Sequence, residues 1–80
     1  SILDSAERAA SEGDFASAEH HLRQAAVLQE AQFGPHHPDL ANTLNNLGIV
    51  CERVGKPADA EACYRTAYAI SRSTLSAASI

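Results

Sequence analysis

The sequence contains few of the residues that build sheets or disulfide frameworks. Of its 80 residues, 5% are aromatic, none is tryptophan or methionine, and the two cysteines form no CxxC pair. A β-sandwich needs more aromatic and β-branched side chains than this. Two cysteines are also too few for a disulfide scaffold, and their scarcity fits a reducing compartment. We therefore expect a cytoplasmic protein without a sheet.

Positive charge and long apolar runs are also scarce. The formal net charge is −4 at pH 7, and the sequence has no basic stripe. Nucleic acids and anionic membrane surfaces both attract proteins through clustered Lys and Arg. No apolar run approaches the roughly 20 residues of a membrane-spanning helix. The sequence therefore predicts no nucleic-acid partner and no membrane partner.

What the sequence does contain is an internal repeat. The segment Gly13–Glu19 recurs as Gly55–Glu61, an offset of 42 residues because 55 − 13 = 42. The residues around each segment carry apolar side chains every three or four positions, which is typical of amphipathic helices. A unit of helix, turn and helix that recurs at fixed spacing indicates a helical repeat architecture.

Local signals predict where the helices begin and end. Gly13 can adopt the left-handed conformation that closes a helix, and Asp14 is a suitable N-cap for the next one. Two prolines and a glycine make Phe33–Pro38 a loop, and Pro38 suits the first turn of a further helix. The four expected helices are Ile2–Ser11, Phe15–Gln32, Pro38–Val54 and a last one from Pro57 or Ala58 towards Ala78.

Apolar stripes along these helices predict the core. The stripe of the second helix consists of Phe15, Ala18, Leu22, Ala25 and Leu28. The stripe of the third helix consists of Leu40, Leu44, Leu47 and Cys51. We expect Cys51 to be buried and Cys63 to be partly exposed. Glu19 and Glu61 occupy the same position in the two units, which predicts a shared structural role.

The second unit resembles a tetratricopeptide repeat. In that family the first helix carries a leucine followed directly by a small residue, and Leu47 and Gly48 stand there in this sequence. The second helix of a repeat carries an alanine, an aromatic residue and another alanine, which are matched here by Ala60, Tyr64 and Ala67. The small residues allow the two helices to pack closely.

The length of the period and the loop narrow this resemblance. Standard repeats of the family have about 34 residues, whereas the period here is 42. The longer period, the loop Phe33–Asp39 and the Leu-Asn-Asn-Leu segment Leu44–Leu47 are similar to the kinesin light chain type. The first unit departs from the pattern, because Ser5 replaces the leucine and Ala9 replaces a bulky residue.

The resemblance implies an all-α fold. Four antiparallel helices would form two tetratricopeptide hairpins, stacked as a short right-handed superhelix. One domain would span residues 1–80, with repeat one at about 1–34, repeat two at about 38–72 and a C-terminal helical extension at 73–80.

The resemblance also implies a peptide-binding groove. In the family the first helix of each unit lines a concave groove, where asparagine side chains hydrogen-bond the main chain of a bound peptide. Asn46 best matches the family's asparagine, and the adjacent Asn45 points about 100° away from it around the helix. The alternative for Asn46 is that it braces a neighbouring helix or faces water. The expected groove residues are Asn42, Asn45, Asn46, Ile49 and Glu52 from the second unit, with Leu3 and Glu7 from the first.

Other chemistry is not indicated by the sequence. The histidines do not converge at a spacing that would give the three or four donors of a zinc site. His37 matches the family's loop histidine, which would fix the loop to a helix, and His36 should be exposed. Neither cysteine has a neighbouring base to activate it as a nucleophile. We therefore predict no metal, no cofactor and no enzymatic activity.

The expected function is protein–protein interaction. The groove would bind a partner peptide or helix, and the chain would serve as an adaptor or scaffold. The alternative is self-association, because the end of a repeat stack exposes apolar surface that a second copy can cover. A homodimer of this kind could also form by domain swapping through the loop at Gly34–Pro38.

Overall fold

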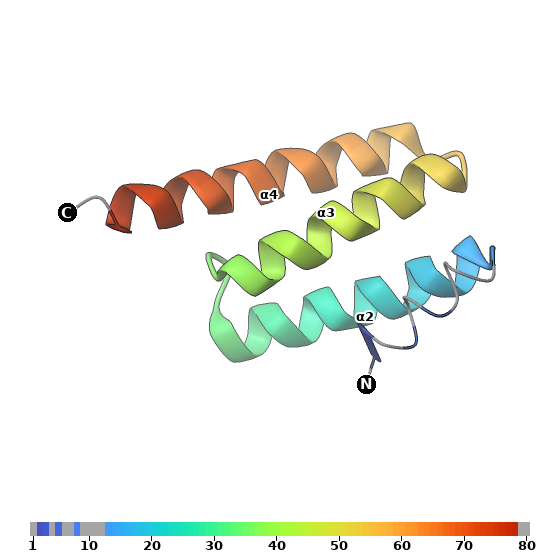
Figure 1. The fold of residues 1–80 in the computed structure, drawn as a ribbon, viewed down its shortest axis with the longest axis horizontal. Helices are drawn as coiled ribbons and strands as arrows, with labels where there is room; N and C mark the ends of the chain where they lie inside the picture. Colours follow the sequence, from blue (N-terminus) through green and yellow to red (C-terminus); the bar gives the residue numbers. More distant parts are fainter. Residues whose placement is uncertain (1, 4, 6–7, 9–12, 79–80) are drawn as a thin grey trace.

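Three helices run back and forth through the described part of the chain (Figure 1). The computed structural model describes residues 2–3, 5, 8 and 13–78. The helices are α2 (Phe15–Phe33), α3 (Pro38–Arg53) and α4 (Pro57–Ala78), and no strand occurs among the described residues. The all-α prediction is therefore confirmed for this part of the chain.

Helix α2 begins and ends as the local signals predict. The side chain of Asp14 accepts a hydrogen bond from the backbone N–H of Ser17 at 3.1 Å, which caps the first turn. Gly34 ends the helix with φ 88°, a left-handed conformation that glycine adopts without a steric penalty. Its N–H donates to the carbonyl oxygen of Glu30 at 2.9 Å, so one of the last helical carbonyls is satisfied.

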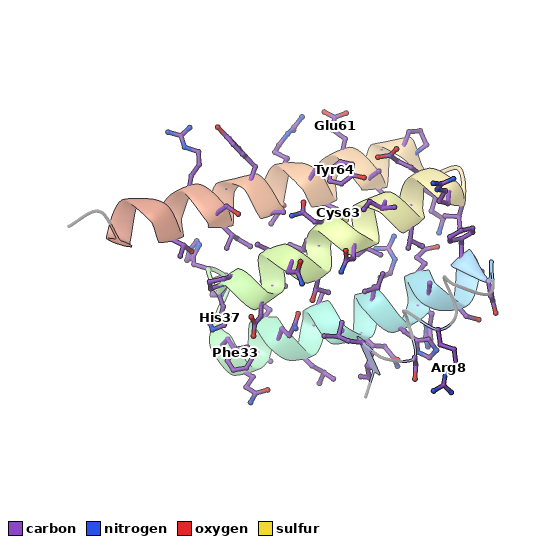
Figure 2. All side chains as sticks on the ribbon, viewed as in Figure 1. Arg8, Phe33, His37, Glu61, Cys63 and Tyr64 are labelled. Carbon is purple, nitrogen blue, oxygen red and sulfur yellow. The ribbon has the colours of Figure 1, made fainter. Side chains whose placement is uncertain are left out.

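Helix α3 is fixed at its start by His37. The Nδ1 atom of His37 accepts a hydrogen bond from the N–H of Asp39 at 3.1 Å, and Pro38 occupies the first helical position. The imidazole also stacks on Phe33, with 4.5 Å between the ring centroids (Figure 2). His37 thus joins the end of α2 to the start of α3, as expected of the loop histidine. His36 is exposed, also as expected.

Helix α3 lies between α2 and α4 and contacts both (Figure 1). Helix α3 packs tightly against α4 at Gly48, where a Cβ atom would lie 2.5 Å from a ring carbon of Tyr64. The core between the three helices is built mainly of alanine and leucine. Its buried apolar residues include Ala18, Leu22, Ala25, Leu40, Ala41, Leu47, Val50, Cys51, Ala60, Cys63, Ala67 and Ile70.

Several expectations need correction or lie outside the described residues. The predicted helix Ile2–Ser11 is described at residues 2, 3, 5 and 8, which are helical, and its other residues are outside the described part. The arrangement of four helices in two hairpins is therefore not shown. Residues 79 and 80 of the C-terminal extension also lie outside, while α4 continues to Ala78.

Two core predictions were wrong. Leu28 is 55% exposed, although it continues the predicted stripe of α2. Cys63 is buried, because it lies on the stripe of α4 that packs against α3 (Figure 2). Among the described residues, no helix combines the length and the apolar character needed to span a bilayer.

Candidate functional site

The exposed side of α3 carries most of the predicted groove residues. Helix α3 buries Leu40, Leu47 and Cys51 on one side, so residues about half a turn away face outward. Asn42, Asn45, Asn46 and Ile49 all lie on this exposed side, and we call these four residues the amide face. Ile49 is 50% exposed, which gives the amide face an apolar centre.

Two residues of the amide face border a groove between α3 and α4. Asn42 and Asn45 line a cavity of about 380 Å³, opposite Ser71 and Thr74 of α4. The amides of Asn42 and Asn45 on one wall and the hydroxyl of Ser71 on the other can donate and accept hydrogen bonds, whereas the hydroxyl of Thr74 already donates to the carbonyl oxygen of Ile70 at 3.0 Å. Asn46 is exposed but does not line this cavity, so the structure brings Asn42 and Asn45 together and leaves Asn46 beside them.

The three asparagines of the amide face have no structural task within the described residues. The side-chain hydrogen bonds of α3 and α4 in this part of the chain involve other residues, such as Glu52, Tyr64 and Thr74. Exposed amides without a partner in the fold remain available to a ligand, since each offers two N–H donors and a carbonyl acceptor.

Glu52 differs from the other predicted groove residues because it is engaged. Its carboxylate accepts a hydrogen bond from the hydroxyl of Tyr64 on α4 at 2.5 Å. This bond stabilises the protonated phenol and is the main reason why the pKa of Tyr64 rises from 10.0 to about 12. Glu52 therefore links α3 to α4 and has less freedom to contact a ligand.

The residues predicted from the first unit contribute less to this site. Leu3 is half-buried and packs against the core cluster that contains Ala18 and Leu22. Only part of its side chain is accessible to a ligand. Glu7 lies outside the described residues.

The cysteines and histidines are not arranged for chemistry. Cys51 and Cys63 are free and buried, and burial raises the pKa of both thiols. A raised pKa favours the unreactive thiol over the thiolate. The rings of His20 and His21 are 5.7 Å apart, and the described residues contain no group of three or more His, Cys, Asp or Glu that could hold a metal ion.

A network of ion pairs between α2 and the start of α4 is the feature that the sequence did not reveal. Glu19 is only 8% exposed and accepts hydrogen bonds from Lys56 Nζ at 2.8 Å and from Arg23 Nε at 2.9 Å. Arg23 also contacts the carboxylate of Asp59 at 3.2 Å. We call Glu19, Arg23, Lys56 and Asp59 the ion network. The repeated position of Glu19 and Glu61 was the only sequence signal for it.

Two comparisons with known proteins complete this description. A sequence model of the family described as Tetratricopeptide repeat matches residues 3–73 of the chain. A comparison with curated proteins found no match. The matched range contains α2, α3 and most of α4, so it includes both the amide face and the ion network.

Proposed function

Because the chain belongs to the tetratricopeptide repeat family, whose members generally serve protein–protein interaction, we propose that the amide face of α3 binds a segment of a partner protein. The observation that carries this proposal is the row of exposed asparagines around Ile49, which have no partner among the described residues. In this role the chain acts as an adaptor or scaffold.

The chemistry of the amide face suits an extended or helical peptide. Asparagine can donate to a peptide carbonyl and accept from a peptide N–H at the same time. Ile49 offers an apolar contact for a side chain of the partner, and the cavity beside Asn42 and Asn45 is large enough to accept another. Main-chain hydrogen bonds would supply affinity and the side-chain contacts would supply specificity.

We also propose that the chain belongs to the kinesin light chain-like form of the family and acts in the cytoplasm. The 42-residue period and the loop Phe33–Asp39 support the first proposal. His37 has a structural role in that loop, because it caps α3 and stacks on Phe33. Two buried free thiols fit a reducing compartment and support the second proposal.

The test begins with peptides selected for binding to the intact chain from a displayed library. Their dissociation constants are then measured by isothermal titration calorimetry for the wild type, Asn46→Ala and Asn45→Ala. Each lost hydrogen bond is worth about 0.5–1.5 kcal/mol, so we expect binding to weaken by roughly 2- to 13-fold.

The matched control is Gln32→Ala, which removes an exposed amide from α2, a helix that contributes no residue to the amide face. It should leave the affinity unchanged, and circular dichroism should show the same helical content for every variant. If both asparagine variants bind the selected peptides as tightly as the wild type, the amide face is not the binding site.

A further inference from the structure

The outer side of α4 carries a second, separate surface. It is a groove of about 610 Å³ lined by Pro57, Ala60, Glu61, Tyr64, Arg65 and Tyr68 of α4 and by Glu52 of α3. We call this surface the α4 groove. Tyr68 is 64% exposed, and Glu61 points outward from the helix (Figure 2).

Because of the 42-residue repeat, the α4 groove corresponds to a surface of α2. Each α4 residue of the groove stands 42 positions after a residue of α2: Phe15, Ala18, Glu19, Leu22, Arg23 and Ala26 in the same order. On α2 the apolar members of that set are covered by the following hairpin. Ala18 and Leu22 belong to one core cluster with Leu47 and Cys51 of α3, and Ala26 packs against a second cluster that includes Leu40.

The charged members of the set on α2 are covered as well. Glu19 and Arg23 form an i, i+4 pair, which contacts Lys56 from the turn between α3 and α4 and Asp59 from the first turn of α4. Lys56 contacts the acid of the pair and Asp59 contacts the base. A cation followed three residues later by an acid is therefore the charge pattern that this type of helix surface accepts.

The α4 groove carries the equivalents of Glu19 and Arg23, but none of the described residues takes the place of Lys56 and Asp59 there. Glu61 and Arg65 form the same i, i+4 pair and bond to each other. Both side chains are largely exposed, at 69% for Glu61 and 76% for Arg65. We propose that the α4 groove docks a helical hairpin of a partner whose turn presents a Lys or Arg followed three residues later by an Asp or Glu. The apolar stripe of that hairpin would cover Tyr64 and Tyr68.

A second copy of this chain does not fit that description. In the first unit, the positions equivalent to Lys56 and Asp59 are Asp14 and Ser17, because 56 − 42 = 14 and 59 − 42 = 17. A copy stacked end to end would place Asp14 opposite Glu61, and like charges at close range repel. The Lys56 and Asp59 of any copy are already engaged by its own Glu19 and Arg23.

The proposal can be tested by attaching the hairpin that this chain already uses. In the fused chain, residues 1–75 are followed directly by a second copy of residues 34–80. Leu75 stands 42 positions after Phe33, so the added Gly34 follows Leu75 just as Gly34 follows Phe33 in the original chain. The added copy's Lys56 and Asp59 then reach Glu61 and Arg65. We expect the fused chain to unfold at a higher temperature than the original chain.

The decisive measurement is whether charge reversals at Glu61 and at the added Lys56 compensate each other in the melting temperature. In the fused chain, Glu61→Lys should lower the melting temperature by about 2–5 °C, and Lys56→Glu in the added copy should restore it. In the original chain, Glu61→Lys should have almost no effect, since Glu61 is exposed there. Independent, additive effects of the two reversals in the fused chain would overturn the proposal.

A second measurement addresses the other occupant. If the original chain dimerises in sedimentation velocity and Glu61→Lys abolishes the dimer, the groove accepts a second copy and the proposal is wrong. Peptide binding by the amide face involves residues of α3 and is tested with the Asn45 and Asn46 variants, which leave the α4 groove unchanged. Either proposal can therefore fail without the other.

Discussion

The glycine at position 48 sets the distance between α3 and α4. A Cβ atom there would lie 2.5 Å from one ring carbon of Tyr64 and 2.9 Å from two others. The ring cannot move away freely, because its hydroxyl is bonded to Glu52. Gly48→Ala should therefore destabilise the protein by about 1–2 kcal/mol, even though alanine is the better helix former by about 1 kcal/mol. Urea unfolding followed by circular dichroism measures this difference.

The control for Gly48→Ala is the same substitution in a Tyr64→Ala background. Without the ring the new methyl group has space, so only the helix preference remains. Gly48→Ala should then stabilise the protein by about 0.5–1 kcal/mol. If the substitution destabilises equally in both backgrounds, the contact with Tyr64 is not what requires glycine.

The phenol of Tyr64 should titrate far above the ordinary range. Its bond to Glu52 raises the pKa to about 12 in the folded protein, against 10.0 for an unperturbed tyrosine. Because the folded pKa is the higher one, this contribution to stability is complete below pH 10 and is lost as the pH rises towards 12. A Tyr68→Phe variant leaves Tyr64 as the only tyrosine, so the ultraviolet absorbance of tyrosinate reports its titration alone.

In that single-tyrosine variant, Glu52→Gln is the diagnostic change. Replacing the carboxylate removes both the strong acceptor and the negative charge that oppose ionisation of the phenol. The pKa of Tyr64 should fall towards 10. An unchanged titration curve would show that Glu52 does not contact the hydroxyl in solution.

At the scale of elements, the ion network fastens α2 to the start of α4. Hydrogen bonds from Lys56 and then from Arg23 lower the pKa of Glu19 below 4.5. Since the folded pKa is the lower one, this stabilisation is present above pH 4.5 and is lost as the pH falls through the folded value. Glu19→Gln should lower the unfolding free energy at pH 7 by about 1–3 kcal/mol. Denaturant titrations at neutral and acidic pH measure both the loss and its pH dependence.

The repeat supplies a matched control for this prediction. Glu61 occupies the same position on α4 and forms the same pair with an arginine, but it is exposed. Glu61→Gln should change stability by less than about 0.5 kcal/mol, as expected for a surface ion pair. Equal losses of stability in Glu19→Gln and Glu61→Gln would mean that Lys56 and Asp59 add no stability beyond that of an i, i+4 ion pair.

The helix ends were predictable because their causes are local. Asp14 caps α2, Gly34 closes it and Pro38 opens α3, and each signal acts within a few residues. The ion network was not predictable, because Glu19 and Lys56 are 37 positions apart and meet only when α2, α3 and α4 pack together. The apolar periodicity of one helix also does not show which residues of the other helices lie beside it.

The burial of single residues was also only partly predictable from the sequence. Thr43 is 1% exposed, although a threonine was not part of the predicted stripe of α3. It is buried because α3 has a helix on each side, which widens its buried face beyond a single stripe. Asn42, Asn45 and Asn46 were identified from the family resemblance, and the structure adds that Asn42 and Asn45 share a cavity with α4.

At the scale of the whole molecule, two surfaces lie on different helices. The amide face belongs to α3, and the α4 groove belongs mainly to the outer side of α4. A partner segment on one would not have to displace a partner on the other. The self-association alternative, including a domain-swapped homodimer, would use the end of the stack or the loop Gly34–Pro38 and would leave the amide face accessible.

The charges of the two turns decide how copies of the chain meet. End-to-end stacking opposes Asp14 to Glu61, so we expect the chain to sediment as a monomer at low and high salt. The double substitution Asp14→Lys and Ser17→Asp gives the first turn the charge pattern of Lys56 and Asp59. This variant should associate with rising concentration, and added salt should weaken the association because it screens exposed charges. A wild type that associates while the variant remains monomeric would refute the assignment of the α4 groove to a Lys-x-x-Asp turn.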